Sequence, residues 1–256
     1  MESSQLVKVF GLLEATADRP EGRTLADLAA EVSLAKPTAH RLLKTLVALG
    51  YMERCGNGIY RQTPAIKRIV TGDDDRRLVQ VAEPFLKQLH EQTQETVNLG
   101  VLRVGRVVYL HVLESPHPLR RIVNPNMTDP FACTALGRAI VAHLPADRQQ
   151  FLLNTTPIER RTPHTVVEMD ALKQILVQTK ELGYAVEENQ TDLGVMCIGV
   201  PVFDGTEPMA AISISLPTLR ATPERIPELL ASLQATAKEL GEKVRFRYAE
   251  SPPLEV

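Results

Sequence analysis

Apolar residues recur at helical spacing in three successive segments of the first fifty residues. In the first segment they stand at i, i+3, i+4 and i+7, namely Leu6, Val9, Phe10 and Leu13, and they predict a helix within residues 3–18. A second helix is expected over residues 24–32, where Thr24 is a typical N-cap residue. A third is expected from Pro37, which suits the first turn of a helix, until just before Gly50.

Two short β-like segments follow the third expected helix. Residues 51–54 (YMER) and 59–62 (IYRQ) are joined by the turn sequence CGNG, whose glycines can adopt positive φ. The order helix, helix, tight turn, helix and hairpin is typical of a winged helix-turn-helix.

From about residue 64 the pattern changes to helices that alternate with strand hairpins. Strands are expected over 96–102, 106–114, 195–204 and 209–216, and helices over 134–144, 168–182 and from Thr222 onward. This order predicts an α+β fold in which an antiparallel sheet is flanked by helices. We expect one domain over residues 1–72 and a second over 73–256, joined by a linker helix at about 65–90.

The local distribution of charge is more informative than the net charge of the chain. The formal net charge of -2 excludes a strongly basic protein, so any nucleic-acid binding requires a local patch. The outer face of the third helix carries such a patch without an acidic residue: Lys36, Pro37, Thr38, His40, Arg41 and Lys44. Arg41 suits a bidentate contact to guanine, and the lysines suit phosphates. Arg54, Tyr60 and Arg61 lie on the hairpin, where a wing would follow the DNA backbone. The simpler interpretation is a solvated basic face, or a module that binds another protein.

Composition excludes several other classes. The three cysteines are widely spaced and form no disulfide framework or C-x-x-C pair, and the N-terminus lacks the pattern of a signal peptide. No apolar run is long enough to span a bilayer, so we expect a cytoplasmic protein with no membrane partner. None of the common catalytic or nucleotide-binding motifs is present, and we expect that the chain is not an enzyme.

Several segments together resemble the IclR family of bacterial transcriptional regulators over nearly the whole chain. They are LADLAAEVSLAKPTAHRLLKTLVALGYMER (25–54), CTALGRA (133–139) and GYAVEENQTDLGVMCIGVPVFD (183–204). The resemblance implies a winged helix that binds double-stranded operator DNA and a GAF-like C-terminal domain that binds a small effector, typically an organic acid or an aromatic catabolite. It also implies a homodimer or homotetramer, with RNA polymerase as a further partner. Effector binding would shift the two winged helices through the linker helix.

The resemblance also implies an effector pocket without a metal or another cofactor. Its residues would be Cys133, Thr134, Ala135, Glu187, Gln190, Cys197, Ser213 and Ser215. The chain departs from the family pattern at Pro37, Ala132, Glu187 and Gln190. Because Glu187 and Gln190 lie near the implied pocket, the ligand does not carry over from any relative.

Other interpretations of these residues are open. The cysteines suit small buried hydrophobes, and Ser213 and Ser215 suit a solvent-facing side of a strand. A metal or thiol-redox sensor built on Cys133 and Cys197 is the alternative function. Arg120 and Arg121 are interpreted as an ordinary surface pair rather than as anion ligands.

Overall fold

The computed structural model describes residues 5–17, 19–63, 65–66, 73–205 and 207–249. The chain divides into two compact units, residues 1–74 and 75–256, and each is described on its own. Of the linker helix expected at about 65–90, residues 67–72 lie outside the described residues, and the described helix α5 runs over Asp73–Thr93.

The N-terminal unit has the predicted helices and hairpin. Helices α1 (Gln5–Ala17), α2 (Leu25–Glu31) and α3 (Lys36–Ala48) precede the strands β2 (Met52–Arg54) and β3 (Ile59–Gln62). A two-residue strand β1 (Arg23–Thr24) adds to the hairpin in the order β1-β3-β2 and is too short for a periodic signal. The core joins the inner faces of the three helices to the wing and contains Leu12, Leu28, Leu43, Leu46, Met52 and Tyr60.

The start of each helix in the helix-turn-helix pair follows from its first residues. Thr24 is the N-cap of α2, because its Oγ1 accepts the Asp27 N–H at 3.3 Å and donates to the Asp27 carboxylate at 2.6 Å. Pro37 lies in the first turn of α3, where its missing N–H costs nothing. Ser33 adopts a left-handed φ of 53° in the turn between the two helices.

The C-terminal unit is built on one antiparallel six-stranded sheet in the order β6-β5-β4-β9-β8-β7. The strands are β4 (Thr96–Arg103), β5 (Arg106–Leu113), β6 (Thr128–Pro130), β7 (Ala185–Glu188), β8 (Val195–Phe203) and β9 (Pro208–Pro217). Helices α6 (Ala135–Val141), α7 (Ala146–Thr155), α8 (Met169–Leu182) and α9 (Arg225–Ala249) complete the unit with the short 3-10 helices η1 (Phe131–Cys133) and η2 (Thr218–Arg220). The α+β fold is therefore as predicted.

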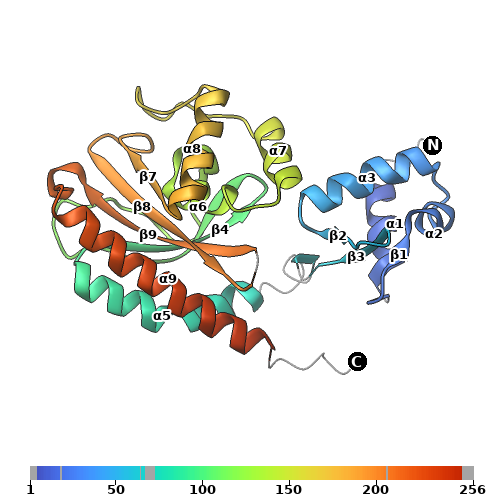
Figure 1. The fold of residues 1–256 in the computed structure, drawn as a ribbon, viewed down its shortest axis with the longest axis horizontal. Helices are drawn as coiled ribbons and strands as arrows, with labels where there is room; N and C mark the ends of the chain where they lie inside the picture. Colours follow the sequence, from blue (N-terminus) through green and yellow to red (C-terminus); the bar gives the residue numbers. More distant parts are fainter. Residues whose placement is uncertain (1–4, 18, 64, 67–72, 206, 250–256) are drawn as a thin grey trace. The chain divides into compact units, whose positions relative to one another are not determined.

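The sheet has a different layer on each face (Figure 1). Helices α5 and α9 lie side by side along one face and pack on the inward residues of β4, β8 and β9, such as Leu99, Ile198 and Ile214. Helices α6 and α8 cover the opposite face, where the core includes Leu136, Ile140, Leu172 and Cys197. Among the described helices, none is long and apolar enough to cross a membrane.

Two glycines let the start of α6 approach the strand β8 and the 3-10 helix η1 very closely. A Cβ on Gly199 of β8 would lie 2.6 Å from the carbonyl carbon of Ala135, and one on Gly137 of α6 would lie 2.4 Å from the Cα of Phe131. Real Cβ atoms do not come this close to backbone, so only glycine fits at either position. The first turn of α6 is thereby held directly against β8.

Candidate functional sites: a basic helix face and a buried polar row

The outer face of α3 presents its predicted basic residues to solvent. Lys36, Pro37, His40, Arg41 and Lys44 are exposed and Thr38 is half-buried, while Ala39, Leu42, Leu43 and Leu46 point into the core. None of the four basic side chains has an ion pair within the described part of the chain, so each is available to another molecule. Ala35 at the N-cap supplies no side-chain cap to the first N–H groups of α3.

The wing residues differ from the prediction in one respect. Arg54 and Arg61 are exposed, but Tyr60 is only 3% exposed and belongs to the core of the unit. Its prediction as a DNA contact is wrong for the side chain, because β3 alternates and position 60 faces inward. Tyr60 instead supports Arg54, whose guanidinium lies 5.9 Å from the centre of the ring. Arg61 donates to Glu53 at 2.7 Å, which offsets part of the charge of the wing.

In the C-terminal unit, polar side chains form a row across the sheet face that α6 covers. The register places Glu187 of β7 opposite Cys197 of β8, Cys197 opposite Ser215 of β9, and Ser213 opposite Asn98 of β4. We call Asn98, Glu187, Cys197, Ser213 and Ser215 the polar row. Each is at most 4% exposed. The interpretation of Ser213 and Ser215 as solvent-facing is wrong, because α6 covers this face.

Hydrogen bonds connect most of the polar row but leave one atom out. The Asn98 amide donates to Ser213 Oγ at 3.2 Å and to Ser215 Oγ at 3.1 Å, and Cys197 Sγ lies 3.2 Å from Ser215 Oγ. The Asn98 Oδ1 atom is buried and has no partner within the described residues. Turning the amide by 180° exchanges its oxygen and nitrogen but still leaves one polar atom unsatisfied. A buried polar atom without a partner is costly and marks a place where a ligand group would be stabilising.

Glu187 ends the row beneath the loop after β7. Its carboxylate accepts the backbone N–H of Gln190 at 3.1 Å, and Thr191 Oγ1 lies 3.1 Å from Oε1 and donates to the Cys133 carbonyl at 2.8 Å. Burial raises the pKa of Glu187, and the hydrogen bond with Cys197 offsets this only in part. Protonation of Glu187 would make the carboxyl a hydrogen-bond donor.

The predicted residues before α6 are buried beside the row, and internal contacts occupy Thr134 there and Gln190 in the loop after β7. Thr134 is the N-cap of α6 and accepts the Gly137 N–H at 3.0 Å, so this N–H is not available to a ligand carboxylate. Cys133 and Ala135 are each 1% exposed. Gln190 is bound by the fully buried Arg138, whose Nη2 donates to Gln190 Oε1 at 2.5 Å.

Arg121 is buried at the candidate site, which its sequence context did not indicate. It is 6% exposed, and it donates to Asp192 at 2.9 Å, to Tyr109 at 3.0 Å and to Asp129 at 3.0 Å. Its positive charge also lowers the pKa values of Glu187 and Cys197, against the larger effect of burial, so it acts on the polar row. The interpretation of Arg120 and Arg121 as a surface pair is thus wrong for Arg121 and correct for Arg120, which pairs with Glu114 in a partly exposed setting.

Nothing in the local sequence separates these two arginines, because the partners of Arg121 lie 8 and 71 residues away. The sequence offered a weak indication that Asn98 belongs to the site, because it is a polar residue between Val97 and Leu99 in an apolar strand.

The thiols do not favour the metal or redox alternative. Burial raises the pKa of Cys133 to about 11 and that of Cys197 well above its ordinary value, so neither is a reactive thiolate at neutral pH. Within the part of the chain that the structure describes, no group of three or more His, Cys, Asp and Glu side chains could hold a metal ion.

Comparisons with known families cover both units. Residues 5–55 match the IclR helix-turn-helix domain, and residues 74–242 match the bacterial transcriptional regulator IclR C-terminal domain. The chain is 30% identical over 247 residues to the HTH-type transcriptional regulator KdgR of Escherichia coli, an alignment that covers 95% of this chain and 93% of that protein.

Solved structures are similar over almost the full length. IclR of Thermotoga maritima has a TM-score of 0.65 and 25% identity, with 94% of this chain and 98% of that chain covered. An IclR homolog from Microbacterium hydrocarbonoxydans, solved in complex with 4-hydroxybenzoate, has a TM-score of 0.62 and 25% identity, with 95% and 100% covered.

Proposed function

Because the chain belongs to the IclR family of bacterial transcriptional regulators, we propose that it binds operator DNA through α3 and the wing and that a small organic acid in the polar row controls this binding. Regulators of the family bind operators and small effectors, so what is new for this chain is the assignment of residues. Operator binding would require the protein to be in the cytoplasm.

The exposed cations of α3 support the DNA contact. Arg41 lies on the outer face, one turn into the helix, where the N-terminal part of a recognition helix meets base edges. Lys36 and Lys44 lie on the same side and suit phosphates, as do the N–H groups at the start of α3. Arg54 of the wing would add a contact to the DNA backbone.

The main observation in favour of an effector site is the buried polar row, in which one atom of the Asn98 amide has no partner within the described residues. A row of five polar side chains under a helix is an expensive way to build a core, since apolar residues of the same volume would need no partners. A ligand that reaches Asn98 would satisfy the remaining atom, and a ligand hydroxyl suits either orientation of the amide because it both donates and accepts.

Besides a hydroxyl at Asn98, the effector is expected to carry a carboxylate, and the surroundings of Arg121 support this second feature. Its partner Asp129 is fully buried and is shared with Arg161, whereas the side chain of its other partner, Asp192, is 46% exposed. An incoming carboxylate would replace Asp192 at Arg121 Nε and conserve the charge balance of the group. The combination of a carboxylate and a hydroxyl is also that of 4-hydroxybenzoate, the ligand of the Microbacterium hydrocarbonoxydans homolog. We therefore infer a hydroxylated organic acid, aromatic or aliphatic.

An apolar surface on α1 supports assembly into a homo-oligomer. Val7 and Phe10 are 61% and 60% exposed on successive turns of α1, in a unit too small to leave apolar surface uncovered without cost. A second copy of α1 would cover them and place two α3 helices on one operator. Two copies double the phosphate contacts, which a unit with this modest charge requires. Polymerase contacts would then act on the DNA-bound oligomer.

Calorimetry with a panel of hydroxylated carboxylates, beginning with 4-hydroxybenzoate, tests the effector site. We expect one ligand to bind the wild type and to lose binding in S213A/S215A and in R121Q, while R120Q behaves as wild type. Binding that is equal in all four proteins would place the ligand elsewhere. Operator binding by the same variants without ligand shows whether the DNA-binding unit is intact, and it separates a failure of the effector site from a failure of folding.

A further inference from the structure

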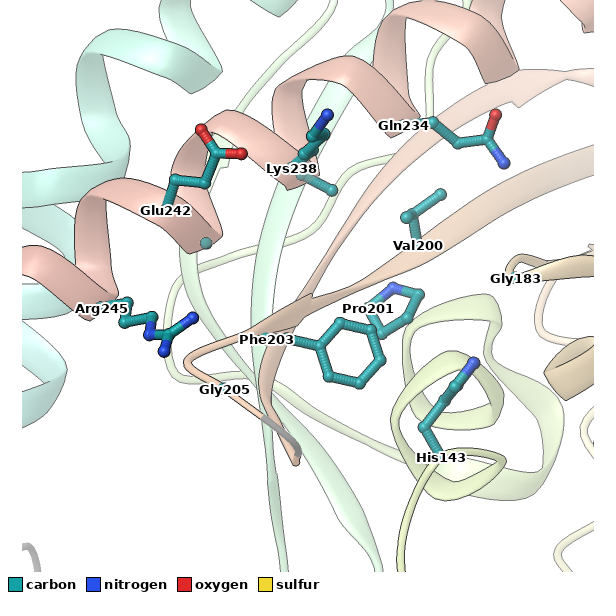
Figure 2. Close-up of a pocket in the computed structure, with 12 residues that line it drawn as sticks. His143, Gly183, Val200, Pro201, Phe203, Gly205, Gln234, Lys238, Glu242 and Arg245 are labelled. Carbon is teal, nitrogen blue, oxygen red and sulfur yellow. The ribbon is translucent and has the colours of Figure 1, made fainter.

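A second concave site lies outside the polar row, and we propose that it binds a small anion with an apolar body. The site is a cavity of about 370 Å³ between α9, the end of β8 and the turn after α6 (Figure 2). This volume falls in the range of small-molecule sites. Phe203 lies six residues after Cys197 on β8, which separates the two sites by about 20 Å at the rise of a β-strand.

The floor of this second site is apolar and rigid. Pro201 and Phe203 form it at the end of β8, and the His143 ring packs edge-on against Phe203 with their centres 5.4 Å apart. A Cβ on Gly241 would lie 2.7 Å from the Phe203 carbonyl oxygen, so α9 touches the strand directly at this point. A flat ring or a branched alkyl group would pack on this floor without moving the backbone.

Unpaired charges rim the floor on the side of α9. Lys238 and Arg245 line the cavity with Glu242, and none of the three has an ion pair or side-chain hydrogen bond within the described residues. Figure 2 shows the Arg245 guanidinium extended toward Phe203, whereas the Glu242 carboxylate points away from the ring. Two cations against one carboxylate leave a net positive charge, and Lys238 and Arg245 stand seven residues apart on one face of the helix.

His143 adds a polar group on the opposite wall. Its Nδ1 lies 2.8 Å from the Ala139 carbonyl oxygen, an acceptor, so Nδ1 carries the hydrogen and Nε2 remains for a ligand. The site thus offers an apolar floor, two cationic donors and one imidazole nitrogen. These groups fit a monocarboxylate whose ring or branched chain lies on Phe203 while its carboxylate faces Arg245, with Lys238 adding positive charge at the rim.

Binding of 4-fluorobenzoate to the full chain, followed by fluorine NMR, tests the second site. We expect K238Q and R245Q each to weaken binding by about tenfold, which corresponds to about 1.4 kcal/mol, and high salt to weaken it in the wild type because both cations are exposed. K243Q is the matched control, because it removes the same charge from an exposed position of α9 that does not line the cavity.

Three outcomes would overturn the proposal. One is that K243Q weakens binding as much as R245Q, which would indicate a general effect of charge. Another is that S213A/S215A removes binding while R245Q does not, which would place the probe in the polar row and support the proposed function instead. The third is that the wild type shows no saturable binding. Circular dichroism of each variant tests whether a loss of 4-fluorobenzoate binding comes from unfolding instead.

Discussion

At the scale of single residues, burial decides what each charged side chain does. Arg120 and Arg121 are neighbours in the sequence, yet only Arg121 is buried and bound to a fully buried carboxylate. A buried ion pair that loses one partner leaves an uncompensated charge, whereas a partly exposed pair contributes little.

R121Q is therefore expected to lower the free energy of unfolding by about 3–5 kcal/mol and R120Q by less than about 1 kcal/mol. Urea denaturation of the wild type and both variants measures this difference. Equal effects in the two variants would mean that Asp129 does not depend on Arg121.

Substitution of Asp192 is expected to strengthen effector binding, whereas substitution of Arg121 is expected to abolish it. If Asp192 competes with the effector carboxylate for Arg121, D192N should bind the effector more tightly than the wild type does, although the variant removes a polar contact from the resting site. Calorimetry with the carboxylate identified for the wild type measures the change. Weaker binding in D192N would show that Asp192 holds the loop in place rather than competing with the ligand.

Glu187 makes stability depend on pH. Burial raises the pKa of its carboxyl above the ordinary value of 4.5, so the folded state binds the proton more strongly than the unfolded state does. This contribution is fully present below pH 4.5 and is lost as the pH rises through the pKa of the folded state. E187Q should therefore gain stability relative to the wild type on going from pH 4.5 to pH 8. Paired urea melts at both pH values test this, and a difference that is constant with pH would contradict it.

Most residues of the polar row could be predicted from the sequence, but only because the chain resembles a known family. No local pattern brings Glu187, Cys197 and Ser215 together, because the contact is made by register across three strands. The exposed basic face of α3 could be predicted from the sequence pattern, since a helix shows its two faces in its own sequence. Tyr60 was misplaced because a four-residue strand gives too few positions to settle which side faces inward.

At the scale of elements, periodic segments were predictable and short ones were not. Helix α8 ends at Gly183 with a φ of 76°, as its glycine predicts. Helix α6 is shorter than the predicted 134–144, because the residues before Pro145 leave the α-helix in a tighter turn. Strands β1 and β6 have two and three residues and carry no period, and α7 has only a weak apolar face.

Gly137 tests how closely α6 is held against its neighbours. Alanine within a helix normally stabilises by about 1 kcal/mol over glycine, but here its Cβ would overlap the Phe131 backbone. We expect G137A to destabilise by about 1–3 kcal/mol or more, as overpacking does. G56A is the control, because a Cβ there meets nothing within 4 Å. Stabilisation of G137A in thermal unfolding would show that α6 has room to move.

Helix α3 gives a prediction for DNA binding in which two substitutions act differently. R41A should cost about 1–3 kcal/mol and relax specificity at one base pair, if Arg41 contacts guanine. K44Q should weaken all sequences alike and lower the slope of log affinity against log salt by about 0.9 for each lost phosphate contact. Anisotropy titrations over a salt series distinguish the two, with K243Q on α9 as the charge-matched control. An unchanged salt slope in K44Q would exclude a phosphate contact.

At the scale of the whole molecule, two units with separate cores have to communicate if an effector is to control DNA binding. Coupling between an effector site and a DNA-binding site is typically about 1–3 kcal/mol, which is enough to change operator occupancy without remodelling either unit. Assembly would be necessary for this coupling, because the ligand has to change how two copies of α3 meet one operator.

V7D and F10D test that assembly. Both positions are exposed in a single chain, so the substitutions should leave the fold intact while they break the oligomer and weaken operator binding. Light scattering coupled to size exclusion measures the mass. An unchanged oligomer in both variants would place the interface elsewhere.

The most direct measurement is operator affinity with and without effector in the wild type and in S213A/S215A. The operator is first selected from genomic fragments with the purified protein, and the effector is the carboxylate that most stabilises the wild type against heat, by about 2.7 kcal/mol at 100 times its dissociation constant. We predict that this carboxylate changes operator affinity by about 5- to 150-fold in the wild type and has no effect in S213A/S215A, whose affinity without ligand is normal. An equal response in both proteins would contradict control through the polar row.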